Sequence, residues 1–322
     1  MKITNKGFKY NMNSGLFQFR LTLILIAVIT YVTVSKNIEG YMEIDGLERF
    51  YIVHVPDDVS SGGSRLPLVL VLHGGGGNAK QMMKFSKFNN TADDGGFIAV
   101  YPEGYNKNWS DGRIGDELPI LRDDVKFISM LIDTLIVKYN VDSSRIFSTG
   151  ISNGGFFSIY LAYKLSNRIL AIAPLCANIP ENLKDNFSLP LPVSMMLING
   201  TEDKLVKYNG GSVGFREGNR GNSISTDETI RMWVGFNGCS TIPSEEVIPN
   251  KNKKDDCKAA KYTYSSGKNN TEVILIKITG GGHTWPGRTQ YLPKIIVGNV
   301  CKDFDANDYI WEFFKRQSIR LQ

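Results

Sequence analysis

The stretch Gly150-Ile151-Ser152-Asn153-Gly154 decides the fold of this chain. It matches the G-x-S-x-G pattern, in which a serine lies on a sharp turn between a strand and a helix. The flanking residues agree with that context, because 145–149 has the composition of a short buried strand and 155–165 that of an apolar helix. The pattern therefore predicts a nucleophile elbow with Ser152 at its tip.

A serine hydroxyl is a weak nucleophile at neutral pH and needs a base, usually a histidine held by a carboxylate. The chain has only 3 histidines. His54 falls in an early strand-like segment, and His73 opens a run of glycines. His283 lies on a glycine-rich loop after the apolar run 273–278, where an α/β-hydrolase carries its base. We therefore predict His283 as the catalytic base.

The acid of such a triad lies between the serine and the histidine in the sequence. The apolar run 193–199 predicts a strand, and the turn that follows it contains Glu202 and Asp203. Both are candidates. Asp203 is preferred because its shorter side chain suits a tight turn.

Hydrolysis of an acyl compound also needs backbone N–H groups that stabilise a developing oxyanion. One donor is expected from Asn153, directly after the nucleophile, and the other from the glycine run that follows His73. We predict Gly75 as the second donor, with Gly74 and Gly76 as alternatives. The run lacks the spacing of a phosphate-binding or dinucleotide-binding loop, so nucleotide binding is not indicated.

Taken together, these motifs resemble those of the secreted esterases grouped as polyhydroxybutyrate depolymerases and feruloyl esterases, which are related to carbohydrate esterase family 1. The resemblance covers roughly residues 45–317 and rests on the stretches 72–79, 101–104, 123–125, 150–155, 199–203, 233–239 and 281–287. It implies a Ser-His-Asp hydrolase without metal or organic cofactor and places the acid at Asp203. One departure is Lys126, where the family leads us to expect a small residue.

Length and composition agree with one catalytic domain over residues 36–322. The chain has 322 residues, of which 42% are hydrophobic, which is ample for a core. Strand-like runs alternate with helical segments, which predicts an α/β fold: a mostly parallel central sheet flanked by helices. The expected strands are near 68–72, 97–101, 145–149, 169–175, 193–199 and 273–279, with an antiparallel edge hairpin strand at 45–56 and helices at 123–139, after the capping box 225–228, and at 304–316.

The first 35 residues differ in character from the rest. A largely apolar run of 14 residues, 21–34, follows Arg20 and has the length of a signal-peptide core. We expect residues 1–35 to be a signal peptide cleaved after Ser35, which predicts a secreted protein. The alternative is an uncleaved signal anchor formed by residues 16–34. A translation start at Met12 would give a more compact signal.

The chain has 4 cysteines: Cys176, Cys239, Cys257 and Cys301. A polar loop separates Cys239 from Cys257, and the family resemblance implies a disulfide between them. Cys176 is expected to be a buried thiol, although a bridge to Cys301 stays open. Because there is no C-x-x-C pair and the histidines are scattered, no zinc site is indicated.

The expected partner is an ester substrate, and polymeric esters of a polysaccharide or a polyester belong to this class. The formal net charge of +5 is modest, and the lysines near 251–254 are followed directly by Asp255 and Asp256, so nucleic-acid binding is not predicted. No stable membrane partner is expected unless the N-terminal segment stays uncleaved.

Candidate substrate-binding residues are Tyr105, Trp109 and Trp285, with framework packing as the alternative. Feruloyl or acetyl esters of plant polysaccharide are the favoured substrates, ahead of polyhydroxyalkanoates. Two readings from other classes are a serine peptidase of the prolyl oligopeptidase type and a catalytically inactive binding protein. The chain has no room for the peptidase's gating domain, and no triad member is missing.

Overall fold

The computed structural model describes residues 36–56, 65–115, 122–215 and 220–319. The predicted signal peptide or anchor, residues 1–35, lies outside the described residues. Among the residues described, no helix is long and apolar enough to span a membrane.

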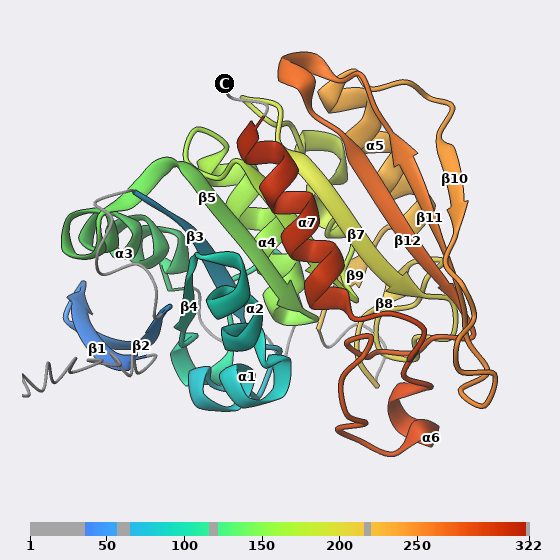
Figure 1. The fold of residues 1–322 in the computed structure, drawn as a ribbon, viewed down its shortest axis with the longest axis horizontal. Coiled ribbons are helices and arrows are strands. Elements are labelled where there is room, and N and C mark those ends of the chain that lie inside the picture. Colours follow the sequence, from blue (N-terminus) through green and yellow to red (C-terminus); the bar gives the residue numbers. More distant parts are fainter. Residues whose placement is uncertain (1–35, 57–64, 116–121, 216–219, 320–322) are drawn as a thin grey trace, which may run out of the picture. The chain divides into compact units, whose positions relative to one another are not determined.

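A ten-stranded sheet runs through the described residues in the order β1-β2-β4-β3-β5-β6-β7-β12-β11-β10 (Figure 1). Its central strands, from β4 to β12, are parallel, and antiparallel strands lie at both edges. This confirms the predicted α/β class with a mostly parallel sheet. The bounds are β1 Lys36–Ile44, β2 Leu47–Val55, β3 Leu66–Leu72, β4 Ile98–Pro102, β5 Val141–Ile151, β6 Ala171–Leu175, β7 Ser194–Gly200, β10 Ser244–Val247, β11 Lys258–Tyr264 and β12 Val273–Thr279.

Helices cover both faces of this sheet, and Figure 1 shows α7 crossing one of them. Helices α3 (Asp124–Tyr139), α4 (Asn153–Leu165) and α5 (Thr226–Asn237) bury their apolar residues in one core. Helices α1 (Ala79–Ser86), α2 (Phe88–Gly95) and α7 (Ala306–Ile319) contribute to the other. The remaining short elements are η2 Tyr105–Lys107, η3 Glu181–Asn186, β8 Gly211–Ser212, β9 Asn222–Ser223, η4 Lys268–Asn270 and α6 Lys294–Val297.

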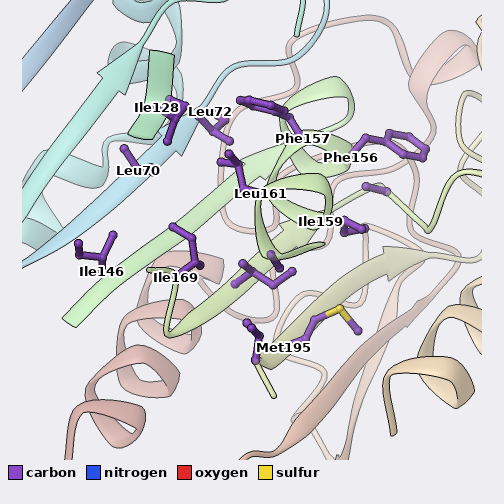
Figure 2. Close-up of a cluster of buried hydrophobic side chains, with 14 of the residues drawn as sticks. Leu70, Leu72, Ile128, Ile146, Phe156, Phe157, Ile159, Leu161, Ile169 and Met195 are labelled. Carbon is purple, nitrogen blue, oxygen red and sulfur yellow. The ribbon is translucent and has the colours of Figure 1, made fainter. Parts of the chain in front are cut away.

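The alternation of side chains along a strand separates these two cores. Leu70 and Leu72 of β3 point into the first core, whereas Val69 and Val71 point into the second. Figure 2 shows Leu70 and Leu72 in the same buried cluster as Phe157 of α4, and all three side chains are fully buried. Burying a side chain of this size stabilises the fold by roughly 1.5–3 kcal/mol. The sheet is thus held from both sides.

The predicted helix starts are capped by side chains. The Asp123 carboxylate accepts the Lys126 N–H at 2.8 Å, which fixes the start of α3. The Ser225 hydroxyl accepts the Glu228 N–H at 3.1 Å at the start of α5. The Glu228 carboxylate pairs with Lys184 at 2.7 Å, so that only the serine half of the predicted capping box forms.

The edge hairpin explains the unusual Lys126. Strands β1 and β2 pair antiparallel, as predicted for 45–56, and their turn places Asp45 and Gly46 at positive φ. Lys126 is exposed on α3, where its ammonium group pairs with the Asp45 carboxylate. A long side chain is therefore accommodated at this position.

Candidate active site

Ser152 adopts the strained backbone expected of a nucleophile elbow. Its φ of 58° and ψ of −125° lie in a region that residues with a Cβ rarely occupy. The turn joins β5 directly to α4, and neighbouring glycines allow these elements to approach each other. A Cβ on Gly154 would lie 2.4 Å from the Leu72 carbonyl oxygen, and one on Gly150 would lie 2.8 Å from the Gly154 carbonyl carbon.

His283 and Asp203 form a buried pair at the ends of neighbouring strands. The distance from His283 Nδ1 to Asp203 Oδ2 is 2.7 Å. The other carboxylate oxygen, Oδ1, accepts the N–H groups of Leu205 and Val206, both at 2.8 Å. Glu202, the other candidate acid, is exposed. The structure therefore brings Asp203, and not Glu202, to the histidine.

A cavity of about 630 Å³ contains both Ser152 and His283 in its lining. Both residues are described, and no hydrogen bond joins the serine hydroxyl to the imidazole. Such catalytic bonds are often long in a substrate-free enzyme and shorten when substrate binds. The cavity therefore brings the predicted nucleophile and base to one space that an ester could enter.

Glycines 74–77 line the same cavity as the serine. The Gly76 N–H donates to the Lys107 carbonyl at 2.8 Å, which commits that group to the loop. Gly75 donates to no protein group in the described part of the chain. Asn153 is the first residue of α4, so its N–H has no acceptor within the helix. The positive end of the α4 dipole lies at the same place.

The side chain of Asn153 holds this turn to the loop that follows η2. Its Oδ1 accepts the Trp109 N–H at 2.8 Å, and its Nδ2 donates to Asp111 Oδ2 at 2.6 Å. Asp111 is itself paired with Arg113 at 2.6 Å, and all of these groups are buried.

His73 is a structural histidine. Its Nδ1 donates to the Gly74 carbonyl at 2.8 Å, and its Nε2 accepts the Gly104 N–H at 2.9 Å. Burial lowers the pKa of His73 from 6.5 to about 4, so the ring is neutral at pH 7. The imidazole thus shapes the glycine loop and is not placed to take the serine proton.

Comparison with known proteins fits this geometry. Residues 50–179 match the family model described as esterase PHB depolymerase. The chain therefore has the α/β-hydrolase fold and is a carboxylic ester hydrolase that is similar to this family over these residues.

Individual relatives of the esterase are distant in sequence. It is 28% identical over 276 residues to the putative esterase NocK of Nocardia uniformis, covering 83% of this chain and 79% of that protein. It is also 28% identical to feruloyl esterase B of Piromyces equi, covering 73% of this chain but only 42% of that longer protein. The solved structure of native sOPH superposes with a TM-score of 0.50 at 14% identity, over 78% of this chain and 82% of that one, which concerns the fold alone.

The aromatic residues predicted to bind substrate do not line the cavity of the esterase. Trp109 is buried, stacks on Phe157 at 4.9 Å between ring centroids, and donates its indole N–H to the His73 carbonyl. Trp285 is fully buried and donates to Asn307 Oδ1 at 2.9 Å. Tyr105 lies in η2 with the Arg122 guanidinium over its ring. Trp109 and Trp285 therefore pack within the framework, and the half-buried Tyr105 is outside the cavity lining, so the structure does not bring these three residues to the cavity.

Other side chains form the cavity wall, and the sequence analysis missed them. They come from α1, from the turns after β7 and β8, and from the loop before α6, and they are Met82, Phe85, Leu205, Phe215, Tyr291 and Leu292. Arg220 also contributes, and its guanidinium donates to Asn108 Oδ1 at 2.9 Å. Of these six, only Met82 and Phe85 belong to a helix. They are three residues apart and so lie on the same helix face, but this spacing predicts packing and does not by itself indicate a cavity wall.

The predicted Cys239–Cys257 disulfide does not form in the esterase. All four cysteines lie in described residues, and none is disulfide-bonded. Cys239 follows α5 and belongs to the core on that face, whereas Cys257 belongs to the core on the opposite face. The sheet separates the two thiols. Cys176 is buried as expected, and its neighbours are Asp203 and His283, not Cys301.

Within the described ranges, two groups of side chains lie close enough to share a metal ion: Cys176 with Asp203 and His283, and Asp255 with Cys257 and Cys301. In the first group the histidine and the carboxylate already bond to each other. Burial raises the pKa of the Cys176 thiol well above its ordinary value, which disfavours the thiolate that a metal requires.

Proposed function

We propose that this protein is a serine esterase that hydrolyses carboxylic esters through Ser152, His283 and Asp203. One observation carries the proposal: the strained Ser152 shares a cavity with His283, whose Nδ1 lies 2.7 Å from the buried Asp203 carboxylate. Nucleophile, orienting acid and base thus follow one another in the chain order of α/β-hydrolases.

The proposed chemistry follows from these positions. The Asp203 carboxylate accepts a hydrogen bond from the Nδ1–H of His283, which leaves Nε2 without a proton as the base. Nε2 takes the Ser152 proton as the hydroxyl oxygen attacks the ester carbonyl, and then protonates the leaving alcohol. Water, activated by the same nitrogen, hydrolyses the acyl-enzyme.

The oxyanion of each tetrahedral intermediate would accept hydrogen bonds from the N–H groups of Gly75 and Asn153. Because Asn153 is the first residue of α4, the positive end of the helix dipole also lies beside these donors and stabilises the negative charge. Removing one donor of this kind typically lowers kcat by about 10²–10³.

For the substrate we propose feruloyl or acetyl esters of plant polysaccharide. The apolar and aromatic walls from Met82, Phe85 and Tyr291 support an aromatic acyl group, and a relative named feruloyl esterase B supports the same class. Polyhydroxyalkanoate is the second candidate. The family description supports it, as do apolar side chains exposed at the cavity: Phe215 is 74% exposed and Leu292 41%.

We also propose that the protein is exported by residues 1–35, since the esters of plant polysaccharide lie outside the cell. N-terminal sequencing of the exported protein tests this proposal. A new terminus at Lys36 supports cleavage after Ser35, whereas intact Met1 in the membrane fraction supports the anchor.

The decisive experiment compares wild type with Ser152→Ala on methyl ferulate, acetylated xylan, a hydroxybutyrate oligomer and p-nitrophenyl acetate. We expect methyl ferulate turnover that Ser152→Ala abolishes while the circular dichroism spectrum is unchanged. A fluorophosphonate probe should label wild type and not the variant. Wild-type turnover in Ser152→Ala would overturn the mechanism, and activity on the hydroxybutyrate oligomer alone would select the second candidate. Peptide cleavage without ester hydrolysis would indicate a peptidase.

A further inference from the structure

Cys257 and Cys301 lie next to each other inside the protein. Their sulfur atoms and a carboxylate oxygen of Asp255 are all within 4.8 Å of one another. Both cysteines belong to the core that contains α7, with exposed fractions of 2% and 0%. Two thiols at this separation, shielded from solvent, are candidates for a covalent bond.

Asp255 fixes the segments that carry the two thiols. Its Oδ1 accepts the Cys257 N–H at 2.9 Å, and its Oδ2 accepts the Lys302 N–H at 2.7 Å. One carboxylate thus joins the loop before β11 to the segment after α6. Because each N–H belongs to a cysteine or to its chain neighbour, the carboxylate also sets the two thiols beside each other.

Both segments also support the loop that carries His283. The Gly287 N–H donates to the Cys301 carbonyl, and the Gly282 N–H to the Asn299 carbonyl, each at 2.9 Å. On the other side, a Cβ on Gly280 would lie 2.2 Å from the carbonyl oxygen of Asp256. The His283 loop is therefore held between the two segments.

We propose that Cys257 and Cys301 form a disulfide that braces the His283 loop. In this step each thiol loses its proton, and the pair transfers two electrons to a small-molecule disulfide such as oxidised glutathione. The oxidant leaves as two thiols through a mixed disulfide. A short movement of the two side chains brings the sulfurs to the bond length of about 2.0 Å. This bond does not depend on the proposed esterase activity.

The surroundings favour a disulfide over a metal ion. Structural zinc sites use four sulfur or nitrogen ligands, whereas this cluster has two sulfurs, and both Asp255 oxygens already accept backbone N–H groups. The adjacent Cys257 thiol and burial raise the pKa of Cys301, so that attack by its thiolate is slow once the segments are packed. The bond therefore forms during folding, while the segments are still exposed.

Refolding under controlled redox conditions tests the proposal. The full chain is denatured and reduced, then refolded either with a mixture of reduced and oxidised glutathione or with excess dithiothreitol. Free thiols are alkylated, and the digest is mapped by mass spectrometry without reduction. We expect a peptide linking Cys257 to Cys301 only with glutathione, with Cys176 and Cys239 alkylated in both samples.

The thermal midpoint gives a second readout. With the bridge, Tm should be higher by roughly 5–10 °C, given the long loop that it closes. Cys301→Ser should remove the difference between the two redox conditions, whereas the control Cys239→Ser should retain it. Wild type compared between redox conditions gives the answer even if Cys301→Ser does not fold.

Three results would overturn the proposal: four alkylated cysteines after refolding with oxidised glutathione, a linked peptide that contains Cys239, or one equivalent of zinc that protects both thiols. Ester hydrolysis is not part of any readout, so loss of the proposed function would leave this result standing.

Discussion

The side-chain amide of Asn153 donates a 2.6 Å hydrogen bond to the Asp111 carboxylate, directly behind the nucleophile elbow. The amide oxygen of the same residue accepts the Trp109 N–H at 2.8 Å. Asn153 is therefore tied through its side chain to the loop after η2, while its backbone N–H begins α4 beside Ser152. The residue that follows the nucleophile is thus oriented by Trp109 and Asp111, which are not part of the cavity lining.

The first prediction is that replacing Asn153 by alanine removes the side-chain bonds that orient the backbone N–H but keeps the N–H itself. The N–H remains, but its position is no longer fixed, so kcat should fall by about 10–100-fold. Loss of the buried amide bonds should lower the free energy of unfolding by about 1–3 kcal/mol. Steady-state kinetics and urea unfolding measure the two effects. The control is Asn222→Ala, which removes an exposed amide bond to Glu181. An unchanged kcat in Asn153→Ala would contradict the positioning role.

A second prediction compares two helical glycines. Gly154→Ala places a Cβ 2.4 Å from the Leu72 carbonyl oxygen, so β3 and α4 must separate. We expect a loss of about 1–3 kcal/mol in the free energy of unfolding. Gly235→Ala in α5 places its Cβ where no atom lies within 4 Å, and should stabilise by about 0.5–1 kcal/mol. Urea denaturation of both variants checks the opposite signs, and equal effects would show that close packing at Gly154 is unimportant.

The candidate triad could be predicted from the sequence, because the G-x-S-x-G motif, the chain order and the scarcity of histidines leave few residues that could serve as nucleophile, acid and base. It also predicted the central strands, since each is a continuous apolar run buried on both faces. It did not predict β10, Ser244–Val247, whose four residues are all exposed and which pairs only with β11. An exposed edge strand has no apolar pattern that a sequence could reveal.

The residues of the cavity wall and the placement of the cysteines could not be predicted from the sequence, for a different reason. An aromatic residue beside a catalytic motif has the same sequence signature whether it points into the cavity or away from it, and Trp109 and Trp285 point away. Tyr291 comes from an irregular loop without periodicity. Cys239 and Cys257 are close in sequence, but Cys239 belongs to the core on one face of the sheet and Cys257 to the core on the other.

The third prediction concerns acid. Because the pKa of His73 is about 4 in the folded protein and about 6.5 when unfolded, only the unfolded chain binds this proton between these values. Stability contributed by the neutral ring is therefore complete above pH 6.5 and is lost as pH falls towards 4, by up to about 3 kcal/mol. His73→Gln retains an acceptor for the Gly104 N–H but cannot titrate. Urea unfolding between pH 7 and 4.5 should show a shallower decline for the variant, and parallel curves would contradict this assignment.

The last prediction tests the cavity wall formed by Phe85, whose ring lies edge-on to Tyr291 at 5.5 Å between centroids. If an aromatic acyl group occupies this cavity, Phe85→Ala removes its contact surface, and such contacts are worth about 1 kcal/mol or more. KM for methyl ferulate should rise about tenfold, whereas p-nitrophenyl acetate, with its small acyl group, should be hydrolysed nearly as in wild type. Tyr41→Ala, which removes an aromatic ring that is 58% exposed on the edge strand β1, is the matched control and should change neither. An equal loss on both esters would mean that Phe85 supports the catalytic loops and does not contact the acyl group.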